Sequence, residues 1–162
     1  MKDERINYIL HTLEPPKGKG LWYGGPTTVG SLRGVSAKQA LWKPAKNRHS
    51  IWELALHIAY WNYAIRMKLI DGNAGSFPRS PSNWPKVDDN AGEKQWSEDK
   101  KLVADEHTLL IEAIRNFDEK KLDKRVPKSS KWTFADLLMG AVTHIVYHTG
   151  QIILMKRLYN SK

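Results

Sequence analysis

The chain has 162 residues, of which 26 are Lys or Arg and 17 are Asp or Glu, giving a formal net charge of +9. It contains no cysteine, which excludes disulfide scaffolds, thiolate nucleophiles, zinc ribbons and iron–sulfur clusters. Domains usually contain about 100–200 residues. We therefore expect one domain over residues 1–162.

The N-terminal sequence and the hydropathy indicate where the protein resides. The first residues, Met1-Lys2-Asp3-Glu4-Arg5, are charged, and no long apolar stretch follows them as a secretory signal would require. No run approaches the roughly 18–20 apolar residues that span a bilayer. The sequence predicts a soluble, cytoplasmic protein that does not insert into membranes.

The first predicted helix covers residues 4–14. Its apolar residues recur at three- and four-residue spacing, and Pro15-Pro16 ends it. A segment that contains Gly and Pro follows, up to about residue 28, and residues 36–41 predict a further short helix. This part of the chain therefore begins with a helix and continues as an irregular segment.

The second predicted helix has a clear start. Ser50 and Glu53 form the pattern of a capping box, in which each side chain satisfies a free backbone N–H group. Apolar residues then recur at helical spacing up to Leu69, and Asp71-Gly72 is predicted to end the helix. Residues 72–95 contain three Pro and three Gly, which predicts a long irregular connection. Connections of this length tend to be functional or mobile.

The third predicted helix begins near Ser97 and runs to about Phe117. Its Glu98 and Asp99 suit the positive end of a helix dipole. Residues 120–131 are rich in Lys and Arg and predict a connection between helices. A fourth helix begins at Thr133, where Asp136 completes a second, weaker capping box.

These four helices predict the fold class. The chain shows no alternating strand pattern with hairpin turns, so we expect an all-α protein, specifically a four-helix bundle with a long crossover connection. The basic residues are not gathered in one block, and no nucleic-acid-binding motif occurs. The positive charge is therefore interpreted as solvated helix faces, and nucleic acid is not an expected partner.

Three of the six histidines predict a metal site. His144 and His148 are four residues apart, so they lie one turn apart on the edge of the apolar face of the fourth helix. His57 holds the equivalent place on the second helix. Bundles bind metals with ligands from facing helices, and a three-His set leaves coordination positions open for water or substrate. The alternative is that these are core histidines whose nitrogens find other partners.

The remaining candidate ligands and pocket residues are supported by weaker patterns. His11 and His107 have no second histidine at helical spacing, and His49 is expected to pack at the start of the second helix. Gln151 shares a face with His148 and could hydrogen-bond a ligand or substrate, or contact another helix. Trp61 and Tyr147 could line a pocket, although aromatic residues at helical spacing are more often core. No acidic residue lies within a turn of His144 or His148 to act as a general base.

Two segments resemble a known family. Residues 49–61 (HSIWELALHIAYW) and 143–152 (THIVYHTGQI) are similar to the signature segments of the DinB-like (YfiT-like) superfamily of DNA-damage-inducible bacterial proteins. The resemblance implies a four-helix bundle with a crossover, often a homodimer, and a divalent metal held by His57, His144 and His148. The family includes S-transferases that use bacillithiol or mycothiol, a maleylpyruvate isomerase, and many proteins described only as metal-dependent hydrolases.

We therefore expect a metal-dependent transferase or hydrolase that acts on a small molecule. Zinc or nickel is the expected ion, with iron or manganese as alternatives. Because the chain has no cysteine, any sulfur chemistry requires an external low-molecular-weight thiol. Two other readings stay open: a non-catalytic, stress-related metal-binding protein, and a basic DNA-associated module whose duplex binding would fall steeply with salt.

Overall fold

A computed structural model describes residues 3–16, 18, 20–21, 24–70, 76–127 and 131–161. Within these ranges the protein is helical, and the only β-type pairing is an isolated bridge between Arg125 and Thr133. The longer helices are α1 (Glu4–Leu13), α4 (Ile51–Leu69), α5 (Glu93–Arg115) and α6 (Phe134–Asn160). Shorter elements are α2 (Thr28–Ser31), α3 (Ala37–Leu41) and a 3-10 turn at Glu119–Lys121. The predicted all-α class is confirmed.

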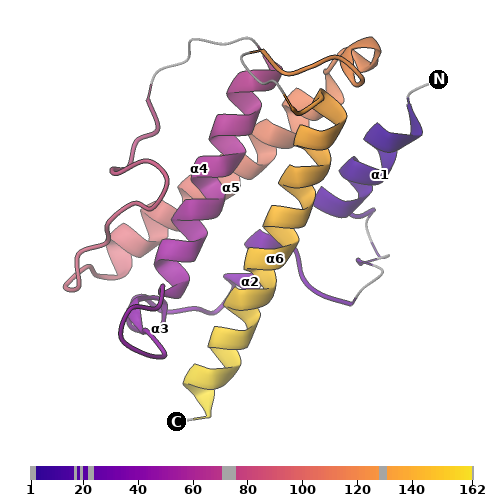
Figure 1. Ribbon diagram of the computed structural model, residues 1–162. Helices are drawn as coiled ribbons and strands as arrows, with labels where there is room; N and C mark the ends of the chain where they lie inside the picture. The colour runs from indigo at the N-terminus through magenta and orange to yellow at the C-terminus, as the bar shows by residue number, and fades with distance from the viewer. Residues whose placement is uncertain are drawn as a thin grey trace.

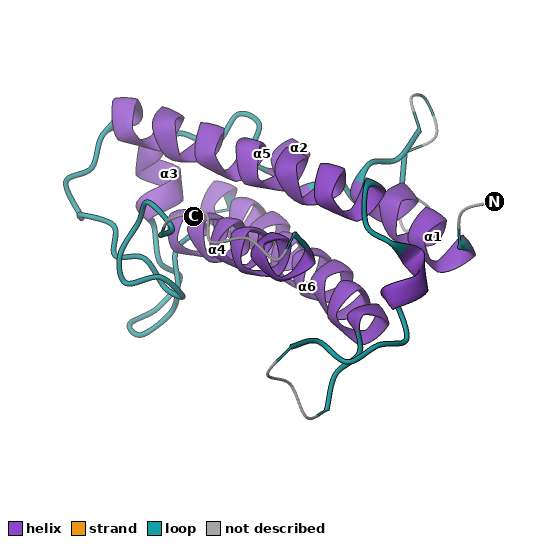
Figure 2. Cartoon of the chain, turned by 90° about the horizontal axis from the view of Figure 1, so that it is seen from above, coloured by secondary structure: helices purple, strands orange, loops and turns teal. Residues whose placement is uncertain are grey.

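The four longer helices form a bundle in which α4 and α6 lie side by side, with α5 behind them and α1 at one side (Figure 1). The view from above shows α5 along one side of the bundle and the α4–α6 pair along the other (Figure 2). Trp52 and Trp96, near the starts of α4 and α5, pack with ring centroids 4.9 Å apart. Toward the other ends, Arg66 pairs with Glu106. The two helices therefore run in the same direction, and the connection between them crosses over as predicted.

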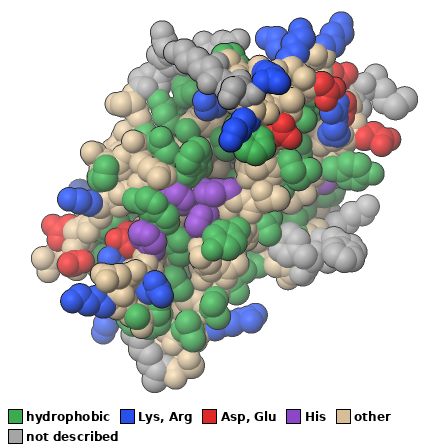
Figure 3. All heavy atoms as spheres, viewed as in Figure 1, with side chains coloured by type: hydrophobic (Ala, Val, Ile, Leu, Met, Phe, Trp, Pro, Cys, Tyr) green, Lys and Arg blue, Asp and Glu red, His purple; other side chains and the backbone are tan. Residues whose placement is uncertain are grey.

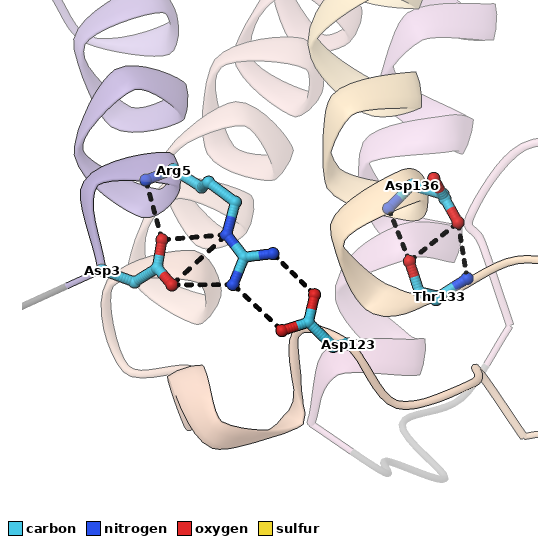
Figure 4. A network of polar contacts seen from close by, with 5 residues as sticks. All are labelled: Asp3, Arg5, Asp123, Thr133 and Asp136. Atoms are coloured by element: carbon cyan, nitrogen blue, oxygen red, sulfur yellow. Dashed lines mark hydrogen bonds and ion pairs between the residues drawn. The ribbon is translucent and has the colours of Figure 1, made fainter.

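Both predicted capping boxes are present. The Ser50 hydroxyl accepts from the Glu53 N–H (3.2 Å), and the Glu53 carboxylate accepts from the Ser50 N–H (2.8 Å). Thr133 and Asp136 make the same reciprocal pair at the start of α6 (Figure 4). This second box is as complete as the first. Local sequence thus determines where the two helices that carry the predicted metal ligands begin.

The predicted start of the third long helix near Ser97 is wrong. Helix α5 begins at Glu93, where the backbone N–H of Ala37 donates to the Glu93 carboxylate (2.6 Å). Trp96 lies in the first turn, is fully buried, and donates from Nε1 to the Val35 carbonyl (2.7 Å). Asp99 points into the core instead of supporting the helix dipole. Burial of Trp96 extends the helix by one turn into the segment that its composition marks as irregular.

Residues 76–92 form the described part of the long connection, and the predicted helix end at Asp71-Gly72 lies outside the described residues. The segment is anchored by the fully buried carboxylate of Asp99, which accepts from Nε1 of Trp52 (2.7 Å) and from Nε of Arg79 (2.8 Å). Phe77 is also buried. The connection is therefore held against α4 and α5 at defined points.

Helix α1 is tied to the chain between α5 and α6. The guanidinium of Arg5 donates to Asp3 at the helix start and to Asp123 (2.6 Å) in that connection (Figure 4). The N–H of Asp3 donates to the Glu119 carboxylate (2.7 Å). The predicted connection at residues 120–131 is present, with residues 128–130 outside the described ranges.

Helix α6 is long and apolar enough to cross a membrane by length and composition alone. This finding differs from the sequence-based expectation that no run approaches the roughly 18–20 apolar residues of a membrane span. In the structure α6 contacts α1, α2 and α4, and it buries Leu138, Ile145 and Ile152. A central bundle helix needs this apolar composition without any membrane.

Loss of the Asp99 carboxylate should destabilise the protein. In Asp99→Ala, the buried Trp52 N–H and the Arg79 guanidinium lose their acceptor, which we expect to cost roughly 2–4 kcal/mol of unfolding free energy. Urea unfolding at pH 7 measures this. Asp105→Ala is the control, because Asp105 forms an exposed pair with Lys101 one turn away and should cost at most about 0.5 kcal/mol. Equal losses of unfolding free energy in the two variants would contradict the anchoring role of Asp99.

Candidate metal centre

Three histidines converge between α4 and α6. Figure 3 shows histidine side chains at the surface of this face, between hydrophobic side chains. His57 comes from α4, and His144 and His148 come from successive turns of α6. Their candidate ligand nitrogens all lie within 4.8 Å of one another. No Asp or Glu of the described residues joins this group.

Hydrogen bonds fix the orientation of two of the rings. Nδ1 of His57 donates to the carbonyl of Asn83 (2.7 Å), and Nδ1 of His148 donates to Oε1 of Gln151 (2.6 Å). Because each of these oxygens only accepts, the proton is on Nδ1, and Nε2 of each ring has a free lone pair. Outer hydrogen bonds of this kind orient the histidines of metal sites.

The donor set fits a divalent ion. Nε2 of His57 and Nε2 of His144 are 3.0 Å apart. Two ligands of one tetrahedral zinc, each bonded at about 2.0–2.1 Å, lie about 3.3–3.4 Å apart, so only a small adjustment is needed. The Nε2 of His57 has a lone pair, so His144 donates the hydrogen bond between these two nitrogens. To hold a cation through Nε2, His144 would take its other tautomer, with the proton on Nδ1.

Burial keeps the cluster neutral. It is the largest cause of the lowered pKa of each of the three histidines, whose ordinary value is 6.5. The pKa of His144 falls to about 4, because burial is joined by repulsion from His148 and His57. Neutral imidazole is the form that binds metal ions. The cluster is therefore ready to coordinate an ion at neutral pH.

Trp84 covers one side of the cluster. Its indole is stacked between the rings of His57 and His49, with centroids 3.8 Å and 3.7 Å away and nearly parallel planes. The side chain of the preceding residue, Asn83, accepts from Nε1 of Trp61 (2.9 Å). His49 thus packs near the start of α4, as predicted, and it does so through Trp84.

Sequence reasoning missed Asn83 and Trp84. They lie in the irregular connection, 26 and 27 residues after His57, where no periodicity marks a residue that faces the bundle. Among the other candidates, His11 is exposed and His107 is buried on α5, where its Nε2 bonds to the Leu13 carbonyl (3.1 Å). Neither joins the cluster.

Two clefts reach the cluster from different ends of the bundle. The first, of about 480 Å³, runs between α4 and α6 and is lined by His144 and Trp61. The second, of about 420 Å³, is lined by His148, Tyr147 and Gln151. Both fall within the range of about 300–1,000 Å³ that is typical of small-molecule sites. The arrangement can therefore bring small molecules to the histidines.

Comparison with known proteins gives one match. The family model described as "DinB superfamily" matches residues 26–152, which include His57, His144 and His148. No curated protein and no solved structure matches the chain.

The metal-free protein should lose stability in acid. Since the folded-state pKa of His144 is lowered, the unfolded chain binds protons more readily between pH 6.5 and about 4. The contribution of neutral His144 to the free energy of unfolding has its full value above pH 6.5 and is lost as the pH drops toward 4. Thermal unfolding in chelator from pH 7.5 to 4.5 measures this. We expect a shallower fall in Tm for His144→Asn, and an unchanged one for the exposed control His11→Asn. Identical profiles of Tm against pH for wild type and His144→Asn would contradict the lowered pKa of His144.

Proposed function

We propose that this chain, which belongs to the DinB superfamily, is a metal-dependent enzyme that acts on a small molecule at an ion held by His57, His144 and His148. The observation that supports this most directly is the convergence of three neutral imidazoles beside two clefts, two of them with Nε2 lone pairs oriented by hydrogen bonds at Nδ1. A site that needed only to stabilise the fold would be closed by a fourth protein ligand. None joins the group among the described side chains.

The imidazole set favours zinc or nickel, with iron or manganese as alternatives. Such an ion supplies Lewis acidity, which lowers the pKa of a thiol or water bound to it and polarises a carbonyl. The protein's own residues orient and shield the site. Asn83 and Gln151 hold two of the rings, and Trp84 keeps water from one face of His57.

S-transfer is the reaction we favour, and because the chain itself has no cysteine, the thiol would be an external small molecule. The S–H proton leaves to solvent, the sulfur forms a bond to an electrophilic carbon, and the leaving group departs with the electron pair of its bond to that carbon. The cluster has no carboxylate to take up this proton. Hydrolysis is the variant in which water replaces the thiol.

Metal content tests the site directly. Untagged protein, purified without chelator or added metal, should contain about one zinc, nickel, iron or manganese ion per chain by elemental analysis. The double variant His57→Ala, His144→Ala should contain none, because a single remaining imidazole binds such ions weakly. His11→Ala, which removes an exposed histidine outside the cluster, should keep the wild-type content. A wild type that holds no metal and takes up none would exclude this function.

Cobalt substitution separates a catalytic site from a structural one. In Co²⁺-loaded protein, adding 2-mercaptoethanol or azide should change the visible absorption bands, because an open coordination position accepts the new ligand. The double histidine variant with the same cobalt and ligand provides the baseline. Bands that do not respond to either ligand would indicate a closed, structural site and support the non-catalytic alternative.

A further inference from the structure

The cleft between α4 and α6 has a defined direction. His144 and Trp61 stand at its inner end, with ring centroids 5.9 Å apart. Because the two helices run in opposite directions, Ile65 of α4 and Leu137 of α6 follow as the walls, and Lys68 lies at the outer end. Seven residues of helix separate Trp61 from Lys68, or about 10 Å along the axis.

The walls of this cleft suit a flat apolar group. Trp61, Trp132, Ile65, Leu137 and Ala141 supply apolar surface. The indole N–H of Trp61 already donates to Asn83, so this tryptophan contributes mainly its apolar ring surface. Aromatic rings bind well against such side chains.

The outer end of the cleft carries two charged groups, Lys68 and Asp136. The Asp136 carboxylate accepts from the N–H and the hydroxyl of Thr133, which hold its pKa below the usual range, so it stays negative but is oriented toward the helix cap. Lys68 forms no hydrogen bond or ion pair within the described part of the chain, and its side chain is exposed. An ammonium group in this position attracts an anion, and the net charge of +9 adds to the attraction.

We propose that this cleft binds an aromatic anion as the substrate of the site, with its rings between α4 and α6 and its anionic group at Lys68. The end of the ring system nearest the histidines is then the position that reacts. This inference rests on the proposed function and names the substrate class for it. The second cleft, with Arg48, His49 and Gln151, is left for the other reactant.

Gly140 offers a way to fill the cleft. It lines the cleft on α6, and a Cβ added there would meet nothing within 4 Å. A side chain at this position therefore begins in open space, and leucine favours the helix more than glycine does. Gly150 lies on the same helix, is equally open, and lines neither cleft, so Gly150→Leu is the matched control.

The test uses 2-naphthoate and the neutral 2-naphthamide as probes of one shape, titrated by calorimetry into the protein as purified and after chelator treatment. Both probes should bind the wild type. Gly140→Leu should weaken both by at least about tenfold, because the side chain occupies their volume, whereas Gly150→Leu should leave both unchanged. Lys68→Met should weaken 2-naphthoate by about threefold to fivefold, the size of an exposed ion pair, and spare 2-naphthamide.

Three results would overturn the proposal: no binding of either probe, equal binding to wild type and Gly140→Leu, or an equal effect of Lys68→Met on both probes. A dimer that Gly140→Leu dissociates in sedimentation would also overturn it, because the cleft would then be a contact between two copies. If the probes bind the chelator-treated wild type but not Gly140→Leu, the inference is supported. This holds even if the metal analysis excludes the proposed function. If only the double histidine variant loses probe binding, the anionic group of the probe binds the metal ion and not Lys68, which would contradict the proposal.

Discussion

The buried carboxylate of Asp99 joins three parts of the molecule that are far apart in sequence. It accepts from Trp52 at the start of α4 and from Arg79 in the long connection, while it belongs to α5 itself. A buried carboxylate needs such partners, so the connection is held where they meet. Asn83 and Trp84 follow Arg79 by only four and five residues. The orientation and cover of His57 therefore depend on a contact made deep in the bundle.

The crossover places the candidate metal centre at the edge of the bundle. Since α4 and α5 run in the same direction, α6 can pack beside α4 in the opposite direction and face it along most of its length. His57 then meets two successive turns of α6. The cluster lies at the edge of the α4–α6 contact and not inside the core, so a cleft opens toward each end of the pair. A simple up-and-down order would change which helices face each other.

The starts of α4 and α6 and the shared face of His144 and His148 could be predicted because they depend on neighbours within one or two turns. Ser50 with Glu53 and Thr133 with Asp136 are local pairs, and a spacing of four residues places His144 and His148 on one face. The start of α5 could not be predicted in this way. Trp96 and Asp99 are drawn into the core by Trp52 and Val35, which lie at least 44 residues earlier in the chain. Tertiary burial outweighed the local composition.

The sequence by itself determined the helical class, the starts of the two capped helices and the helix faces on which His57, His144 and His148 lie, because helical periodicity is a short-range property. Only the tertiary structure decided that Asn83 and Gln151 fix the tautomers of His57 and His148, that Trp84 stacks between His49 and His57, and that Trp61 lines a cleft ending at Lys68. Most of these features join residues from separate elements. Their distances follow from how the helices pack and cross, which no pattern along the chain records.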